Sequence, residues 1–326
     1  MKTILLVAIL LVILIIVLWS LGPRYVIKET PGHTPSIPDD LDAYLNEAEA
    51  GIPDLKSGVQ KEIIWAYEDK RVTDYAIIYL HGFSSSRKEV SPVFEDVARD
   101  LEANLFFTRF KGHGSQTGEL LNTADRDDWM EDALEAQEIG KRIGRKLIIA
   151  GTSHGGLLAT WLAAQKKDSE PAALILISPN YHPCDPRTNL LSAPWARQLL
   201  PLVFGNHRNW SAQNSGHEFY WNTRYPVHAL FPMMAQVNAI TRSCPEEVSV
   251  PTLVFYSTQD QTVDSQLIAE VFDRFPASKK SLVPIENSGD KDHHILAGDI
   301  LSPQTTEEVE RSILSFVRSI DATGKQ

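Results

Sequence analysis

Residues 146–156, KLIIAGTSHGG, decide the fold of this chain. The first five residues form an apolar run of strand length, and an apolar segment of helical length follows the last glycine. Between them stands G-T-S-H-G, which matches G-x-S-x-G in the strand–turn–helix context that the pattern requires. The flanking glycines leave room for a strained turn that lifts the Ser153 hydroxyl clear of the sheet. The stretch therefore predicts a nucleophilic Ser153, with a Gly-rich tight turn as the plainer alternative.

Apolar runs and amphipathic segments alternate on both sides of this stretch. Strands are expected at residues 75–80, 105–110, 146–150, 172–177, 252–256 and 281–284, and helices at 89–103, 127–142, 156–165, 266–275 and 306–320. Such alternation predicts a parallel sheet covered on both faces by helices, so the fold class is α/β. Residues 181–245 interrupt it with nine aromatic residues. They are expected to form a cap that lines a pocket, or a small helical subdomain with its own core.

Two backbone N–H groups are candidates for an oxyanion hole. His154 follows the nucleophile at the start of the next helix, where the helix dipole also favours negative charge. His81, Gly82 and Phe83 come directly after the strand at 75–80. The N–H of Phe83 is therefore the second candidate donor. In this interpretation His81 braces the loop and is not a general base.

A serine hydroxyl also needs a base that takes its proton and an acid that orients the base. Where G-x-S-x-G carries the nucleophile, the expected order along the chain is Ser, then Asp, then His. Asp260 lies just beyond the strand that follows the cap and is the candidate acid; Asp264 is expected at the following helix. The base is expected after the next strand, where His293 and His294 are adjacent. Only one of these two histidines can face Ser153, and the other is a neighbour.

The amino terminus carries a long apolar run. Residues 4–19, ILLVAILLVILIIVLW, contain no charge, Gly or Pro, and with the next residues they approach the length of about 20 that crosses a bilayer. The residues Ser20, Leu21, Gly22 and Pro23 make a poor cleavage site, so an uncleaved anchor over residues 1–21 is expected rather than a removed signal peptide. The numbers of basic residues on its two sides are nearly equal, so the positive-inside rule does not decide the orientation. Amino-terminal anchors usually leave the following domain outside the cytoplasm, so the body is expected on the extracytoplasmic side.

The remainder divides into a linker and a body. Residues 22–60 are polar, acidic and punctuated by Pro and Gly, which is typical of a linker, and residues 61–326 form the predicted catalytic domain with its cap at 181–245. The chain has a formal charge of −11; residues 1–28 hold three basic and no acidic residues, so residues 29–326 carry 28 − 42 = −14. A body this acidic argues against nucleic acid as the natural ligand, because phosphate binding needs clustered Lys and Arg.

Two cysteines, Cys184 and Cys244, flank the cap. They are too few for a disulfide scaffold or a four-thiolate zinc site. If the body is exported, a bridge between them could pin the base of the cap. Two ordinary thiols are the plainer alternative.

With these motifs in view, the sequence resembles the α/β-hydrolase superfamily, and within it the bacterial carboxylesterases and the monoacylglycerol-lipase-like or lysophospholipase-like proteins. The matching segments are HGF at 81–83, GHG at 112–114, GTSHGG at 151–156, D-x-x-V at 260–263 and HHILAGD at 293–299. Similar esterases carry Val or Ile directly after the catalytic histidine and an acid five positions on. His294, Ile295 and Asp299 fit that spacing, so the resemblance favours His294 over His293 as the base.

The resemblance implies an α/β-hydrolase fold and a serine hydrolase that cleaves acyl esters through an acyl-enzyme intermediate. Its implied substrates are small-molecule or lipid esters, monoacylglycerols and lysophospholipids among them, and it implies no metal or organic cofactor. Peptidases, amidases and thioesterases share the fold and the triad, so they are the alternatives within the superfamily. A non-catalytic binding module is the alternative from another class. Such proteins usually lack a triad member, whereas all three have candidates here.

Overall fold

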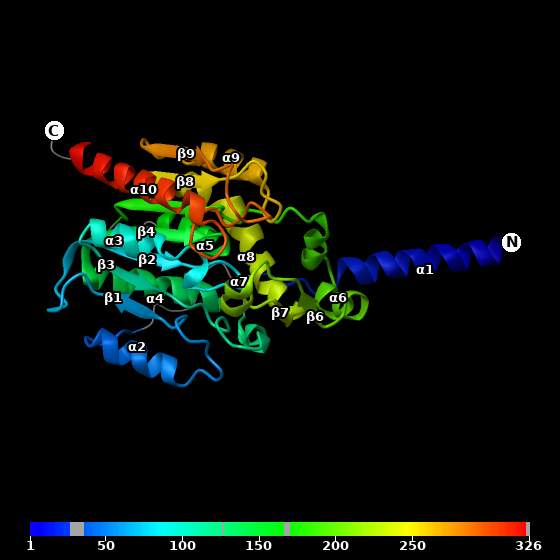
Figure 1. Cartoon of the computed structure of the whole chain (residues 1–326). Coiled ribbons are helices and arrows are strands. Elements are labelled where there is room, and N and C mark those ends of the chain that lie inside the picture. The colour runs from blue at the N-terminus through cyan, green and yellow to red at the C-terminus, as the bar shows by residue number, and fades with distance from the viewer. Residues whose placement is uncertain (27–35, 126, 166–169, 324–326) are drawn as a thin grey trace.

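The computed structural model describes residues 1–26, 36–125, 127–165 and 170–323, and its centre is one seven-stranded sheet. The strands are β1 (Glu62–Ile64), β2 (Thr73–Leu80), β3 (Asn104–Phe107), β4 (Gly144–Thr152), β5 (Ala173–Ile177), β8 (Thr252–Tyr256) and β9 (Lys280–Pro284). They lie in the order β1-β3-β2-β4-β5-β8-β9 (Figure 1), and all neighbours pair in parallel except β1 and β3. The carboxyl ends of the parallel strands therefore meet at one edge of the sheet, where ligands bind in open α/β sheets.

Helices cover both faces of the sheet. They are α3 (Val93–Asp100) and α10 (Pro303–Thr323) on one face, and α4 (Asp128–Ile143), α5 (His154–Ala163) and α9 (Ser265–Arg274) on the other. Successive residues of β2 point alternately into the two apolar clusters: Ile77 packs with α3 and α10, and Ile78 packs with α4 and α5. A strand buried on both faces reads as a continuous apolar run. The expected α/β class is confirmed.

Three elements differ clearly from the sequence prediction. The strand expected over residues 105–110 is β3, which ends at Phe107. The helix expected over residues 89–103 is shorter, because residues 87–89 form a 3₁₀ turn and α3 begins only after Pro92. The strand β1 was not predicted at all. Its three residues are too few to show a periodicity, and its pairing with β3 is what makes it a strand.

Much of the segment expected as a linker belongs to the body. The helix α2 (Leu41–Ala50) buries Leu41 and Leu45, four residues apart, in the same cluster as α4. The hydroxyl of Tyr44 donates to Glu135 at 2.6 Å. Residues 36–60, the larger part of the linker expected over residues 22–60, are therefore packed against the body. One short amphipathic helix is enough to dock them. Residues 27–35 of that expected linker lie outside the described residues.

The segment of residues 181–245, which the sequence predicts as a cap, lies at the carboxyl edge of the sheet (Figure 1). Its main elements are α6 (Ala196–Phe204), β6 (His207–Asn209), α7 (Ser215–Tyr220), β7 (Arg224–Pro226) and α8 (Leu230–Ser243). The helix α8 packs against α5. Tyr181, Tyr225 and Phe231 of the cap are buried in the same apolar cluster as α5. The cap thus shares its core with the sheet and does not form a subdomain with a separate core.

The amino-terminal helix α1 (Lys2–Ser20) projects away from the body (Figure 1). None of its residues is buried against the rest of the protein. Among the described residues it is the one helix long and apolar enough to cross a membrane, a criterion that a signal sequence also meets.

Candidate active site

Ser153 occupies a strained turn between β4 and α5. Its φ of 54° and ψ of −117° are unusual for a residue with a side chain. A Cβ on Gly155 would collide with the carbonyl of Leu80, so only glycine fits there. The N–H of Ser153 donates to the carbonyl of Ile177 at 2.9 Å, and the Ser153 carbonyl accepts from Asn180 N at 2.9 Å. The neighbouring strand therefore holds the backbone of the predicted nucleophile in this conformation.

Asp260 and His294 are in contact at the same edge of the sheet. Oδ2 of Asp260 lies 2.8 Å from Nδ1 of His294. The other carboxylate oxygen, Oδ1, accepts from the N–H groups of Thr262 at 2.8 Å and Val263 at 2.9 Å. The Asp260 side chain is fully buried. Three donors thus satisfy a carboxylate whose position also orients the imidazole.

The electrostatic surroundings favour the protonated form of His294. Burial is the largest influence and would lower its pKa, but the charge and hydrogen bond of Asp260 outweigh it and raise the pKa of His294 above its usual value. The negative charges of Asp290 and Glu89 act in the same direction. Asp290 also accepts the backbone N–H of His294 at 3.0 Å, which fixes the loop that carries the ring.

The two alternatives left by the sequence face elsewhere. Asp264 caps α9, because its Oδ1 accepts from the N–H groups of Gln266 and Leu267 at 3.0 and 3.1 Å. His293 has a left-handed φ of 51°, and its Nδ1 lies 3.3 Å from Oγ of Ser288. The left-handed residue turns the two adjacent histidines in different directions, and it is His294 that reaches Asp260.

The loop at 81–83 passes directly beside Ser153. A Cβ on Gly82 would lie 3.3 Å from the Cβ of Ser153, so the glycine permits this close approach. The ring of Phe83 packs edge-on against Tyr225 of the cap, with centroids 5.3 Å apart. His154 is the first residue of α5, so its N–H has no carbonyl partner within the helix. The structure thus places Gly82, the residue before Phe83, and His154, the residue after Ser153, next to the predicted nucleophile.

Two buried histidines, His81 and His113, support this loop. Nε2 of His81 accepts the N–H of Phe110 at 3.1 Å, and Nε2 of His113 accepts the N–H of Ser84 at 3.0 Å. Burial lowers the pKa of His81 to about 3 and holds that of His113 well below its usual range. Both rings are therefore neutral, and His81 braces the loop as the sequence suggested.

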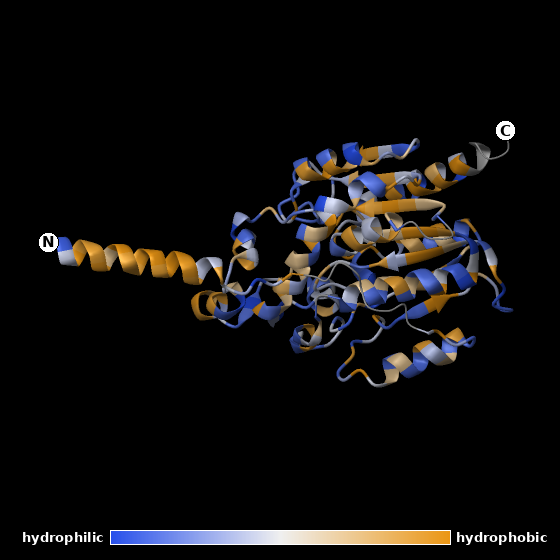
Figure 2. Cartoon of the chain, turned by 180° about the vertical axis from the view of Figure 1, so that it is seen from behind, coloured by the Kyte–Doolittle hydropathy of each residue, from blue (hydrophilic) through white to orange (hydrophobic). Residues whose placement is uncertain are grey.

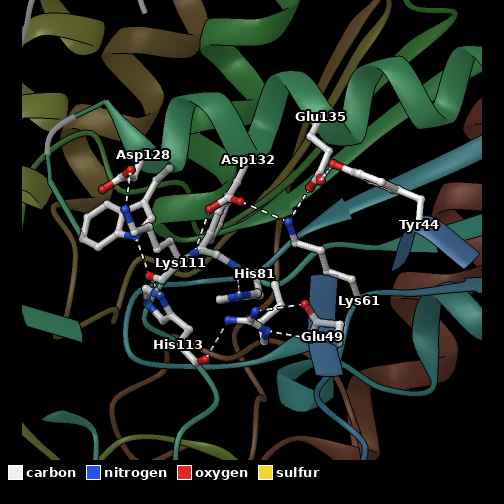
Figure 3. Close-up of polar contacts among 12 residues, drawn as sticks. Tyr44, Glu49, Lys61, His81, Lys111, His113, Asp128, Asp132 and Glu135 are labelled. Atoms are coloured by element: carbon white, nitrogen blue, oxygen red, sulfur yellow. Dashed lines mark hydrogen bonds and ion pairs between the residues drawn. The ribbon is translucent and has the colours of Figure 1, made fainter. Parts of the chain in front are cut away.

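A charged network lies next to these histidines (Figure 3). Nζ of Lys61 on the β1 side contacts Asp132 at 3.1 Å and Glu135, both on α4. The other carboxylate oxygen of Asp132 accepts the N–H of Lys111 at 2.7 Å. The network connects the segment that carries His113 to α4. Through Lys61 it also connects the loop at 81–83 to the edge strand β1.

Sequence reasoning missed Glu89, a buried carboxylate beside the site. Its Oε1 accepts both the N–H of Gly82 at 2.7 Å and the hydroxyl of Tyr79 at 2.6 Å. That hydroxyl also lies 2.8 Å from Oγ1 of Thr152, the residue before the nucleophile. Burial raises the pKa of Glu89 to about 7, although these hydrogen bonds act against the rise. The Glu89 carboxylate thus connects the loop at 81–83, through Tyr79, to the strand that carries the nucleophile. Its negative charge also raises the pKa of His294.

The cap supplies a second residue that the sequence did not reveal. Oε1 of Gln236 on α8 lies 2.7 Å from Nε2 of His154, so this ring nitrogen donates the hydrogen bond. Burial lowers the pKa of His154 to about 4. The side chain of His154 is therefore neutral and tied to the cap. No local pattern marks Gln236 for this position.

The structure bears on two other sites considered from the sequence. Cys184 and Cys244 are free thiols, so the bridge considered at the base of the cap is not present. In the described part of the chain, no group of three or more His, Cys, Asp or Glu residues is placed to hold a metal ion.

Solved structures of lipolytic enzymes share this fold. A metagenome-derived lipolytic enzyme of the LipS and LipT pair matches with a TM-score of 0.66 and 19% identity, over 81% of this chain and 99% of that chain. A soluble variant of monoglyceride lipase from Saccharomyces cerevisiae matches with a TM-score of 0.63 and 12% identity, over 80% and 91%. The monoacylglycerol lipase of Paleococcus ferrophilus matches with a TM-score of 0.58 and 13% identity, over 80% and 98%. At these identities the likeness establishes the α/β-hydrolase fold.

The family assignment rests on the sequence itself. A family model described as serine aminopeptidase, S33, matches residues 72–293, which include Ser153 and Asp260 and end just before His294. The matched region begins at β2 and contains the loop at 81–83, the nucleophile turn and the whole cap. The chain therefore belongs to the serine aminopeptidase S33 family of α/β hydrolases.

Proposed function

We propose that the protein is a membrane-anchored serine hydrolase that cleaves carboxylic esters, with Ser153, His294 and Asp260 as its catalytic triad. The observation that carries the proposal is the 2.8 Å contact between His294 Nδ1 and Asp260 Oδ2, at the sheet edge where Ser153 stands on its strained turn. With Nδ1 held by the carboxylate, Nε2 is the ring nitrogen that takes the serine proton.

The proposed reaction has two halves. Oγ of Ser153 attacks the ester carbonyl while His294 takes the serine proton, and the oxyanion that forms is bound by the N–H groups of Phe83 and His154. The collapse of this intermediate expels the alcohol, which His294 protonates. The same base then activates a water that releases the acid from the acyl-enzyme. Asp260 stabilises the imidazolium in both halves, in agreement with the raised pKa of His294.

Acyl esters with a single long chain are the proposed substrates, monoacylglycerols or lysophospholipids in particular. An amphiphile of this kind partitions into a bilayer, where the proposed anchor holds the enzyme. Two of the structural neighbours are named as monoglyceride or monoacylglycerol lipases, which supports the same choice. The name of the family favours aminopeptidase activity as the second candidate.

Hydrolysis assays distinguish the two candidates. The full chain in detergent is assayed on p-nitrophenyl esters of two to sixteen carbons and on aminoacyl p-nitroanilides. We expect ester hydrolysis, and the chain-length optimum then sizes the acyl site. Cleavage of the anilides with no cleavage of any ester would replace the esterase proposal with the peptidase one.

In this proposal residues 1–21 are an uncleaved anchor and the body, 61–326 with its cap at 181–245, lies on the extracytoplasmic side. We expect the expressed chain to stay in the membrane pellet after alkaline carbonate washing and to keep the mass of residues 1–326. Leu10→Arg combined with Leu14→Arg is expected to release it, since each charge at the centre of a spanning helix costs about 2.5–3.5 kcal/mol. Val72→Arg, at an exposed site on the body, is the matched control and stays in the pellet. A mature mass that lacks residues 1–21 would show a cleaved signal instead.

Glu89 is expected to position the oxyanion loop. Glu89→Gln keeps an oxygen at the place of Oε1 for both Gly82 and Tyr79, whereas Glu89→Ala loses both bonds. We expect the alanine variant to lose about 10²-fold in kcat on a short soluble ester with little change in KM, comparable with the loss of one oxyanion donor. The glutamine variant is expected to retain most of kcat. Equal activity of the two variants would contradict this role.

The charge of Glu89 has a separate, measurable effect. Because a negative Glu89 raises the pKa of His294, Glu89→Gln is expected to move the acid limb of the kcat/KM profile to lower pH. The folded-state pKa of Glu89, about 7, lies above the usual value of 4.5, so its contribution to stability is lost as pH rises between these values. The thermal midpoint of the glutamine variant, relative to the parent, is therefore expected to rise from pH 5 to pH 8. If the acid limb did not move, the charge of Glu89 would have no effect on the pKa of His294, which would contradict this prediction.

A further inference from the structure

The helix α6 of the cap exposes an unusual number of large apolar side chains. Leu199, Leu202, Val203 and Phe204 have exposed fractions of 46, 82, 71 and 54%. We call these four residues the α6 apolar face. Leaving such a contiguous surface in water is unfavourable, and in soluble proteins it marks a place where something binds.

The α6 apolar face lies next to the end of α1 that meets the body. Nε1 of Trp195, just before α6, donates to the carbonyl of Leu18 at 2.8 Å. The backbone N–H of Trp195 donates to the carbonyl of Pro23 at 3.0 Å. Figures 1 and 2 show α6 beside the end of α1 that meets the body, while the rest of α1 extends outward. The contact between them is a feature of tertiary structure, since about 180 residues separate the two segments in the chain.

With α1 as the proposed anchor, the length of the helix would bring this junction to a membrane surface. Its 19 residues span about 28 Å at 1.5 Å per residue, which is close to the thickness of about 30 Å of a hydrocarbon core. Trp19, Trp195 and Tyr25 gather at this junction, and the guanidinium of Arg197 lies 5.2 Å from the ring centre of Tyr25. Trp and Tyr are the residues that prefer the boundary between headgroups and acyl chains.

We infer that the α6 apolar face inserts into the leaflet in which α1 ends, so that the cap rests on the bilayer and the enzyme takes its acyl substrate from that leaflet. The inference rests on the anchor and the esterase activity proposed above. The α6 apolar face binds the bilayer and not a protein partner, because it lies beside the end of α1 and continues the apolar surface of that helix. The charge of −14 on residues 29–326 makes electrostatic attraction to anionic lipid an unsuitable driving force. Apolar burial drives the contact, and it is therefore insensitive to salt.

The arrangement of the cap gives this contact a consequence for the substrate. The cap stands between the carboxyl edge of the sheet and α1 (Figure 1). It also contacts the catalytic machinery, because Tyr225 packs on Phe83 and Gln236 binds His154. An amphiphile leaving the leaflet next to α6 therefore has to cross only the cap to reach Ser153.

Fluorescent probes on the full chain in lipid nanodiscs test the contact. Single cysteines are introduced by Leu202→Cys on α6, Val12→Cys on α1 and Val72→Cys, in a Cys184→Ser, Cys244→Ser background of unchanged activity, and are labelled with an environment-sensitive dye. Val72 comes just before β2, at the sheet edge opposite the cap, and is 45% exposed, so it is the matched exposed control. We expect spin-labelled lipids to quench the probes at 202 and 12, and aqueous iodide to quench only the probe at 72, at low and high salt alike.

Each other outcome has one meaning. A probe at 202 that iodide quenches as strongly as the probe at 72 overturns the inference; if the probe at 12 is still quenched by lipid, the anchor stands. Iodide quenching at 12 as well would overturn the anchor with it. Shielding of residue 202 only in discs that hold two chains would identify a second copy as the occupant and would equally overturn the inference.

Activity measurements test the route of the substrate. Leu202→Ser combined with Val203→Ser is expected to lower kcat/KM about tenfold on a monoacylglycerol in nanodiscs, the equivalent of about 1.4 kcal/mol, and to leave p-nitrophenyl acetate hydrolysis within twofold. Val72→Ser is the control and should change neither rate. Equal rates of the double variant and the parent on both substrates would overturn the inference. Failure of the parent to hydrolyse p-nitrophenyl acetate would instead contradict the esterase proposal.

Discussion

The Ser153→Ala variant is expected to lose ester hydrolysis almost completely, with kcat lowered by about 10⁴-fold or more. The change removes only the hydroxyl that attacks the substrate. The backbone contacts that hold the turn, from Ser153 N to Ile177 and from Asn180 to the Ser153 carbonyl, do not involve the side chain. The fold should therefore persist, and a p-nitrophenyl ester assay at matched thermal midpoint measures the chemistry alone. A fluorophosphonate reagent should label the parent and not the variant.

Ser178→Ala is the matched control for this experiment. Ser178 is also buried, follows β5 at the same edge of the sheet and has a positive φ of 43°. Its hydroxyl has no hydrogen-bond partner among the described residues, so its loss should leave the rate within a few fold. Activity that survives Ser153→Ala, or a comparable loss in both variants, would overturn the assignment of the nucleophile.

Removal of the base is the second large effect. His294→Ala is expected to lower kcat by about 10⁴-fold or more, since no other group takes the serine proton. His293→Ala, the control one residue away, should stay within a few fold, because His293 faces Ser288 and not Asp260. Kinetics of the two variants on one soluble ester decide between the adjacent histidines. A greater loss in His293→Ala would reverse the choice.

The parent should also show the titration of this base. The charges of Asp260, Asp290 and Glu89 raise the pKa of His294, so kcat/KM is expected to fall on the acid side with an apparent pKa above that of an ordinary histidine. The proton sits on Nε2 below that pKa and blocks the base. Activity that stays constant down to pH 5 would show that a different group accepts the proton.

The sheet and its order of motifs were predictable because they depend on local patterns. Apolar runs of strand length, such as AALILI at 172–177, report burial on both faces, and the turn around Ser153 requires glycine at fixed offsets. Chain order then restricts where an acid and a base can stand. Asp260 comes just after the strand at 252–256, which favours it over Asp264 as the acid. In the structure Asp260 contacts His294, whereas Asp264 caps α9.

Docked segments with mixed composition were harder to predict. Residues 36–60 look like a linker because Pro, Gly and acidic residues dominate them, yet two buried leucines and a few polar contacts dock α2 on the body. Burial depends on what lies opposite a side chain, and composition does not report that. The same holds for Tyr181, Tyr225 and Phe231 of the cap, which are buried in the core of the sheet.

The chain's own pattern was sufficient for the α/β class, for the nucleophile turn and for a short set of candidate partners, because each depends on residues close together in sequence. Contacts between distant segments were decided by folding alone. Glu89 reaches Gly82 and Tyr79, Gln236 reaches His154, and Trp195 reaches the end of α1. A single left-handed residue at 293 determines which of two equivalent histidines meets the carboxylate. The physical reason is that hydrogen bonds and burial act between neighbours in space, and only the packed sheet and cap make these residues neighbours.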